Sequence, residues 1–166
     1  MFCRLLFVIA CVLQTGFAQA KKTPPKFVAK VVKVIDGDTI DAIYQDSTYR
    51  IRLCGIDAPE NGQDFYEEAK EQLYKLICKQ NVTIEYNGED IHGRTLGVIY
   101  RTSDTLNINR EMVREGLAWN YVAYSTDKEL PKLEKEAREK QIGLWSLFHY
   151  FEPWEFRKNQ RSSSEQ

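Results

Sequence analysis

Short apolar segments separated by turn residues fill the stretch from residue 27 to residue 100. Residues 27–53 are rich in β-branched side chains and are interrupted at Asp36-Gly37-Asp38 and at Asp46-Ser47. This pattern predicts three strands in one meander. Two further runs, 82–86 and 95–100, predict a fourth and a fifth strand on either side of a polar loop.

Three later segments place apolar residues at helical spacing. The first helix is predicted to begin after a cap at Asp64 and to bury a stripe made of Phe65, Ala69, Leu73, Leu76 and Ile77. The second covers 107–115 and stops at Gly116, and the third has Pro131 in its first turn and stops at Gly143. Five strands and three helices predict an α+β fold, a five-stranded, OB-fold-like β-barrel with three packed α-helices.

The first twenty residues have the layout of a secretory signal. Arg4 precedes nine consecutive apolar residues, 5–13, and Ala18-Gln19-Ala20 resembles a signal peptidase site. Nine residues are too few to cross a bilayer core, which needs about 20, so we expect no stable membrane span. The prediction is a signal peptide over 1–20 and a secreted or periplasmic protein; a buried strand, or a lipid anchor at Cys11, are the alternatives.

Beyond that signal, the length predicts one domain over 27–157, followed by a disordered, serine-rich tail over 158–166. The net charge of the whole chain is −1, which excludes a protein that holds nucleic acid by overall positive charge. Without a Cys-x-x-Cys motif or a Cys/His cluster, a structural zinc site is excluded as well. Cys54 and Cys78 can form a disulfide or remain free thiols.

Carboxylates gather at two turns that follow predicted strands. Asp36 and Asp38 lie at the first turn, and Asp57 and Glu60 lie at the second, after the strand that carries Arg52. Neighbouring strands of one sheet can bring such turns together and offer hard oxygen ligands to a calcium-like ion. Arginines and a free glutamate beside such an ion suit phosphodiester hydrolysis, since cations stabilise the transition state and the glutamate can activate water.

Three ordered motifs resemble the signature of the thermonuclease (staphylococcal nuclease) family. They are 34–39 (Val-Ile-Asp-Gly-Asp-Thr), 52–60 (Arg-Leu-Cys-Gly-Ile-Asp-Ala-Pro-Glu) and Gly93-Arg94, and weaker similarity continues to Trp145. Any one motif alone would be weak, but three in the same order and spacing are specific.

The resemblance implies a role for each matching residue. Asp38 and Asp57 match the carboxylate ligands of Ca²⁺, and Ala58 matches a ligand that acts through its backbone carbonyl. Asp36 matches a carboxylate that acts through water. Catalytic roles are implied for Glu60, which matches the residue that activates the attacking water, and for the phosphate-binding pair Arg52 and Arg94.

A nearby aromatic residue, Tyr121 or Tyr124, matches the residues that flank the nucleotide. His92, close to Arg94, is interpreted as a loop residue. The aromatic segment 148–156 can stack on bases or pack on the domain, and packing is favoured.

The sequence therefore predicts a secreted, calcium-dependent endonuclease that hydrolyses DNA, RNA or both, and acts as a monomer. The alternative function is a catalytically silent OB-fold module that binds nucleic acid or protein. A silent module would be free to lose the aspartates or the Arg/Glu/Arg set. All of these residues are present, which favours the enzyme.

Overall fold

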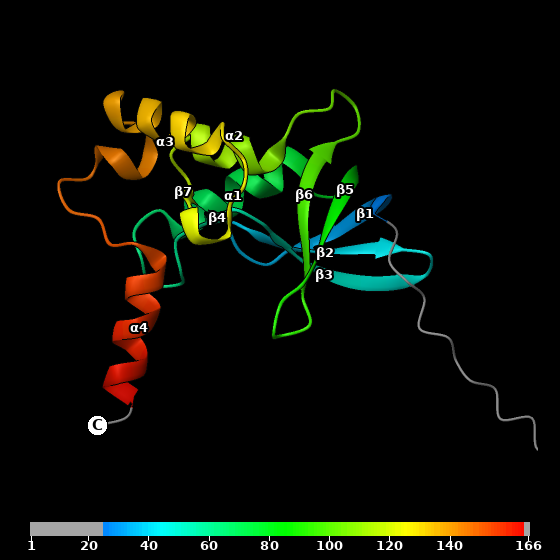
Figure 1. Cartoon of the computed structure of the whole chain (residues 1–166), viewed down its shortest axis with the longest axis horizontal. Coiled ribbons are helices and arrows are strands. Elements are labelled where there is room, and N and C mark those ends of the chain that lie inside the picture. Colours follow the sequence, from blue (N-terminus) through cyan, green and yellow to red (C-terminus); the bar gives the residue numbers. More distant parts are fainter. Residues whose placement is uncertain (1–24, 165–166) are drawn as a thin grey trace, which may run out of the picture.

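Five strands close into a barrel at one end of the protein (Figure 1), as described by a computed structural model that covers residues 25–164. The strands follow one another around the barrel in the order β1-β2-β3-β6-β5, and β5 pairs with β1 to close it. Their bounds are β1 Lys26–Val34, β2 Thr39–Tyr44, β3 Ser47–Leu53, β5 Asn81–Glu89 and β6 Thr95–Arg101. All neighbours are antiparallel except β3 and β6, which are parallel. The predicted α+β fold with an OB-fold-like barrel is confirmed.

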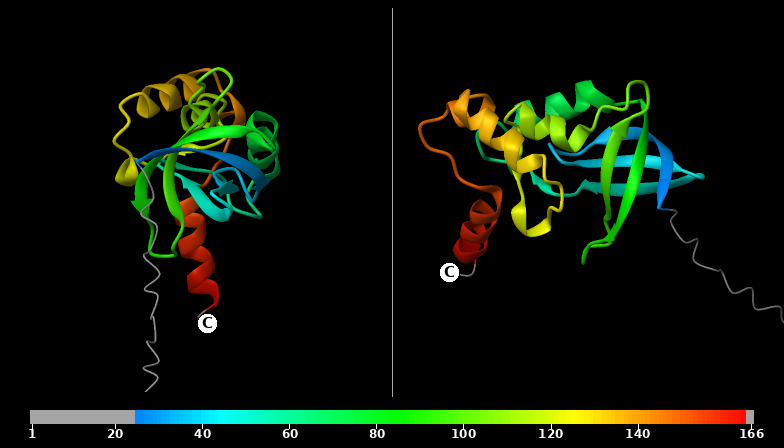
Figure 2. Two further views of the ribbon diagram at one scale, coloured as in Figure 1. Left: turned by 90° about the vertical axis from the view of Figure 1, so that its right-hand side faces the viewer. Right: turned by 45° about the horizontal axis from the view of Figure 1, so that its top comes forward.

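Three helices pack against one end of the barrel, as predicted (Figure 2). They are α1 Tyr66–Ile77, α2 Ile108–Arg114 and α3 Leu130–Glu139. The cap predicted for α1 at Asp64 is wrong. Phe65 is the N-cap residue, with a left-handed φ of 65° and no side-chain hydrogen bond. Its ring packs against both apolar clusters of the protein, so side-chain packing fixes the start of this helix.

A fourth α-helix corrects the prediction of a disordered tail over 158–166 for residues 158–164; residues 165–166 lie outside the described part of the chain. Helix α4 spans Pro153–Ser164, and it projects away from the barrel in Figure 1. Pro153 occupies its first position, where a missing N–H costs nothing. The serines that suggested disorder donate side-chain hydrogen bonds to carbonyls one turn earlier, from Ser162 to Lys158 and from Ser163 to Asn159.

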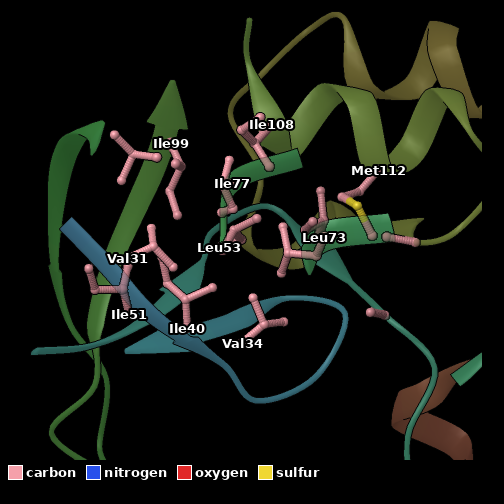
Figure 3. Close-up of a cluster of buried hydrophobic side chains, with 14 of the residues drawn as sticks. Val31, Val34, Ile40, Ile51, Leu53, Leu73, Ile77, Ile99, Ile108 and Met112 are labelled. Atoms are coloured by element: carbon pink, nitrogen blue, oxygen red, sulfur yellow. The ribbon is translucent and has the colours of Figure 1, made fainter. Parts of the chain in front are cut away.

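The barrel interior and the helices share one apolar core (Figure 3). Alternating residues of the strands point inward, among them Ile40, Ile51 and Ile99, and they meet Leu73 and Met112 of the helices. A smaller cluster joins Trp119 and Trp145, whose rings contact edge to face at 5.4 Å. The remaining elements are short. β4 Ile56–Asp57 lies between β3 and α1, β7 Trp119–Asn120 and the 3-10 turn Val122–Tyr124 lie between α2 and α3, and the 3-10 turn Gly143–Ser146 follows α3.

Asn109 of α2 fastens the helices to the barrel. Its buried amide nitrogen donates to the carbonyl oxygen of Cys54 at 2.8 Å, and its amide oxygen accepts from the backbone N–H of Ile99 at 3.0 Å. These bonds satisfy polar backbone groups where β3 and β6 meet the helices. They also fix the end of β3, from which the functional residues follow.

Both cysteines in the described part of the chain, Cys54 and Cys78, are free thiols and half-buried. Burial raises the pKa of the Cys54 thiol, so it behaves as a small packing residue. The signal peptide predicted over 1–20 and the alternative anchor at Cys11 lie outside the described residues. Within 25–164, no helix is long and apolar enough to span a bilayer.

Candidate active site

The two carboxylate turns meet on one arginine. Strands β2 and β3 pair with Thr39 opposite Arg52, which brings the turn before β2 to the end of β3. Arg52 Nη1 lies 2.8 Å from Asp38 Oδ2, and Arg52 Nη2 lies 2.7 Å from Asp57 Oδ1. Because the guanidinium is planar and has several N–H groups, it holds both carboxylates at once.

Asp38 and Asp57 are almost wholly buried. Asp38 accepts hydrogen bonds from the backbone N–H of Ala58 at 2.7 Å and from the hydroxyl of Thr39 at 3.1 Å. Burial is the main cause that raises the pKa of Asp38 to about 8; Arg52 opposes the shift, and the charges of Asp36 and Asp57 add to it. Burial and the neighbouring acids thus disfavour the charged form of Asp38, and Arg52 offsets part of this effect.

Close backbone contact holds the two turns in place. A Cβ atom at Gly37 would lie 2.7 Å from the Cβ of Ala58 and 2.8 Å from that of Ala69, which is too near for any side chain. Glycine at this position therefore lets the Asp36-Gly37-Asp38 turn lie directly on Ala58 and on α1. Within the turn, Asp36 Oδ1 accepts from the backbone N–H of Asp38 at 3.1 Å.

Glu60 lies in the loop that leads from β4 to α1. Gln63 accepts from the backbone N–H of Glu60 at 2.8 Å, which fixes this loop, while the Glu60 side chain remains 39% exposed. Its carboxylate is linked to Asp57 through Arg157 of α4, at 2.5 Å from Glu60 and 2.9 Å from Asp57. An accessible carboxylate beside the aspartate pair is well placed to take a proton from a water molecule.

Arg94 is the predicted site residue that the structure does not join to this cluster. Its ion pair is with Asp90 of the same loop, at 2.6 Å, and the backbone N–H groups of His92 and Arg94 bond to the same carboxylate. These bonds lower the pKa of Asp90 against the opposing effect of burial. His92 is an exposed loop residue, as interpreted from the sequence.

Arg94 directly precedes β6, the strand that pairs with β3 and its Arg52. Arg52 lies opposite Leu96 in the parallel pair of β3 and β6, and Thr95 and Gly97 point inward. Leu96 therefore faces outward, as Arg52 does. The role of Arg94 in binding phosphate stays a prediction.

Tyr121 and Tyr124 follow β7, next to the strand that holds Asp57. The two rings contact each other with centroids 4.7 Å apart, and Trp154 of α4 stacks on Tyr121 at 5.2 Å with an angle of only 2° between the planes. The packing interpretation of segment 148–156 is right for Trp154. Tyr150 contacts Trp145 edge to face although it is exposed, and Phe148 and Phe151 are exposed as well.

The residues present fit a hard divalent cation held by few protein ligands. Asp38 and Asp57 supply carboxylate oxygens, and the backbone of Ala58 lies against Asp38. In residues 25–164, no three side chains of His, Cys, Asp or Glu gather into a metal-binding group. A cation here would thus depend on two carboxylates, a backbone carbonyl and water, which is an open site.

Sequence reasoning missed Arg157. Its guanidinium makes bonds to both Asp57 and Glu60, and these hold its pKa above the usual value although burial lowers it. Arg157 lies about one hundred residues after its partners, at the end of the predicted domain and directly before the predicted disordered tail. The one available signal was the helical spacing of Trp154, Arg157 and Arg161 after Pro153.

Comparison with known proteins identifies relatives of this chain. The model of the family described as "Staphylococcal nuclease homologue" matches residues 50–147. A protein named micrococcal nuclease from Shigella flexneri is 41% identical over 147 residues, which cover 83% of this chain and 84% of the relative. An Escherichia coli protein named as an uncharacterized endonuclease is 43% identical over 128 residues, 77% of this chain and 83% of its own length. Another from the same species, named protein ParB, is 40% identical over 138 residues, 78% of each chain. With this match over most of its length, the chain belongs to the staphylococcal nuclease homologue family.

Proposed function

We propose that this protein is a secreted, calcium-dependent endonuclease that hydrolyses phosphodiester bonds of DNA and RNA. The observation that carries the proposal is the Arg52 guanidinium bound at once to Asp38 and Asp57, with the accessible carboxylate of Glu60 beside them. Relatives whose names include nuclease and endonuclease support the same reaction class.

The residues divide the reaction between them. Glu60 takes a proton from a water molecule whose oxygen attacks phosphorus; the new P–O bond forms as the bond to the leaving oxygen breaks, and that oxygen is protonated by solvent. Arg52 is held by its aspartates, so it meets the charge that grows on the phosphate oxygens without reorganising. Arg94, in the loop directly before β6, supplies a second guanidinium once its Asp90 pair opens.

Asp38, Asp57 and the carbonyl of Ala58 would hold Ca²⁺, which when bound neutralises charge on the attacked phosphate. The donors are all hard oxygens, as calcium prefers, and the calcium concentration outside cells suits a site with few ligands.

The direct test is cleavage of double-stranded DNA, single-stranded DNA and RNA by the purified protein, with calcium or with excess chelator. Cleavage within the strands that requires calcium is the expected result. Binding of nucleic acid without cleavage under every condition would favour the silent binding module instead.

Replacing Asp38 with asparagine should raise the calcium concentration needed for half-maximal rate by about tenfold or more, because a charged oxygen ligand becomes neutral. The change keeps the shape of the side chain and an oxygen that can accept from Ala58. Asp104→Asn is the matched control, since Asp104 pairs with Arg101 in a loop at the far end of β6. An unchanged calcium requirement in the Asp38 variant would refute this ligand assignment.

Export is the second part of the proposal, and it depends on the signal predicted over residues 1–20. The exported protein should begin at or near Lys21, which intact-mass measurement after expression in a secreting host would show. A mass that retains the first twenty residues contradicts export by this signal, and a mass with added acyl chains on Cys11 indicates the lipid-anchored alternative.

A further inference from the structure

Helix α4 places two large side chains on the candidate active site. Trp154 and Arg157 are three residues apart and therefore project from the same face of the helix. That face contacts Glu60 of the β4–α1 loop and Tyr121 after β7. The remainder of α4 extends away from the barrel (Figures 1 and 2).

The positively charged guanidinium of Arg157 binds the carboxylates of Asp57 and Glu60. Its Nη2 lies 2.9 Å from Asp57 Oδ2, and its Nη1 lies 3.2 Å from Asp57 Oδ1 and 2.5 Å from Glu60 Oε1. Both oxygens of a proposed calcium ligand and one oxygen of the proposed general base are thus engaged by one guanidinium. While Arg157 binds Asp57, the oxygens of Asp57 are not fully free to bind a metal ion. In the same state, Arg157 takes the position beside Glu60 that the attacking water would need.

A second contact covers the aromatic side of the site. The indole of Trp154 lies parallel to the ring of Tyr121, a geometry that a nucleobase adopts on an aromatic side chain. The chain just before α4 is attached as well, because Gln63 donates to the carbonyl of Phe151 at 2.8 Å. Arg157 thus places a cation where the proposed function needs a metal ion, and Trp154 places a flat ring where it needs a nucleobase.

We infer that α4 is a latch that closes the active site from within the same chain. Arg157 and a divalent cation are alternative occupants of Asp57 and Glu60, and Trp154 and a nucleobase are alternative partners of Tyr121. This inference rests on the proposed function, because it takes Asp57 and Glu60 as the metal-binding and catalytic groups. Calcium and nucleic acid then open the latch by binding only to the open form.

The attachment of α4 is weak enough to open. Apart from Pro153 and the partly buried Trp154, Phe156 and Arg157, the first helical turns carry exposed side chains, and residues 158–163 are all exposed. Arg157 itself is 31% exposed, so water screens its ion pairs. A short terminal helix whose residues 158–163 are all exposed belongs to the less stable part of a fold.

The first experiment measures calcium binding to the full-length mature protein by calorimetry, without nucleic acid. Arg157→Ala should bind calcium about tenfold more tightly than the parent, because a closed latch lowers the apparent affinity by the fraction of molecules that are open. Trp154→Ala should change affinity in the same direction. Lys158→Ala is the control, since it removes an equal charge from the neighbouring position, where the side chain is 74% exposed.

The second experiment follows amide hydrogen exchange in residues 153–163. Calcium should speed exchange there in the parent, and Arg157→Ala should show the fast exchange already in chelator. Cleavage at limiting calcium should rise in Arg157→Ala and stay at the parental rate in Lys158→Ala.

Each outcome decides between the two proposals. If the parent binds calcium and cleaves nucleic acid but Arg157→Ala binds calcium no more tightly, the latch is wrong and the proposed function stands. Equal tightening by Lys158→Ala would also overturn the latch, since general charge would then explain the effect. If the parent neither binds calcium nor cleaves, the proposed function fails and the latch fails with it.

Discussion

Glu60→Gln should lower the rate of phosphodiester cleavage by about 10²–10⁴, the usual contribution of a general base. Glutamine keeps the size of the side chain and can still hydrogen-bond Arg157, but it cannot accept a proton from water at neutral pH. Substrate affinity should change little, because the interaction that is lost belongs to the transition state. The measurement is single-turnover cleavage of a short oligonucleotide at saturating calcium.

Glu67→Gln is the matched control for this prediction. Glu67 is an exposed acid in the first turn of α1, seven positions along the chain, and its side chain has no part in the proposed chemistry. It should cleave at the parental rate. A Glu60→Gln protein that stays within about threefold of the parent would place the general base elsewhere, because a positioned base contributes far more than this.

Arg52→Lys should lower the cleavage rate by about 10²–10³, as expected when a preorganised donor to the transition state is lost. Lysine keeps the charge but cannot bridge Asp38 and Asp57 with two nitrogens while also facing a phosphate. The double variant Arg52→Lys, Glu60→Gln should lose less cleavage rate than the product of the two single losses, since both groups act in the same chemical step.

Arg52→Ala should also destabilise the folded protein. The side chain of Arg52 is 12% exposed and its two aspartates are buried, so truncation leaves buried charge, at a cost of about 3–5 kcal/mol in the free energy of unfolding. Urea unfolding in chelator should show this loss, and calcium should restore part of it by replacing the missing positive charge.

Arg50→Ala provides the comparison from the same strand. Arg50 pairs with Asp41 on the barrel surface, with half of its side chain exposed, so its loss should cost at most about 1 kcal/mol and leave cleavage unchanged. Equal losses of stability in the two variants would contradict the account of Arg52 as the buried centre of the site.

Local pattern was sufficient to predict the barrel. Alternation along β3 assigns Ile51 and Leu53 to the core and Arg50 and Arg52 to the outside, and the structure has this arrangement. The start of α1 was not predictable in this way, because Phe65 adopts a left-handed conformation that is stabilised by distant packing contacts.

Most of the candidate site could also be predicted, since Asp38, Arg52, Asp57, Ala58 and Glu60 lie in two short motifs. What the motifs could not supply is the pairing between them, which needs the β2–β3 register and the close approach of Gly37 to Ala58. Arg94 shows the limit, because its motif predicts a phosphate ligand while the structure pairs it with Asp90.

The sequence by itself determined the five barrel strands, three of the helices and the site residues that lie in the motifs, because these depend on periodicity and on patterns within a few residues. Only the tertiary structure decided that residues 153–164 form a helix and that this helix returns to Asp57 and Glu60. A short polar helix gains little stability from its own propensity and depends on contacts such as the Trp154 stack. Contacts between residues one hundred positions apart leave no pattern in a single sequence, so the contacts of Arg157 with Asp57 and Glu60 became visible only in the fold.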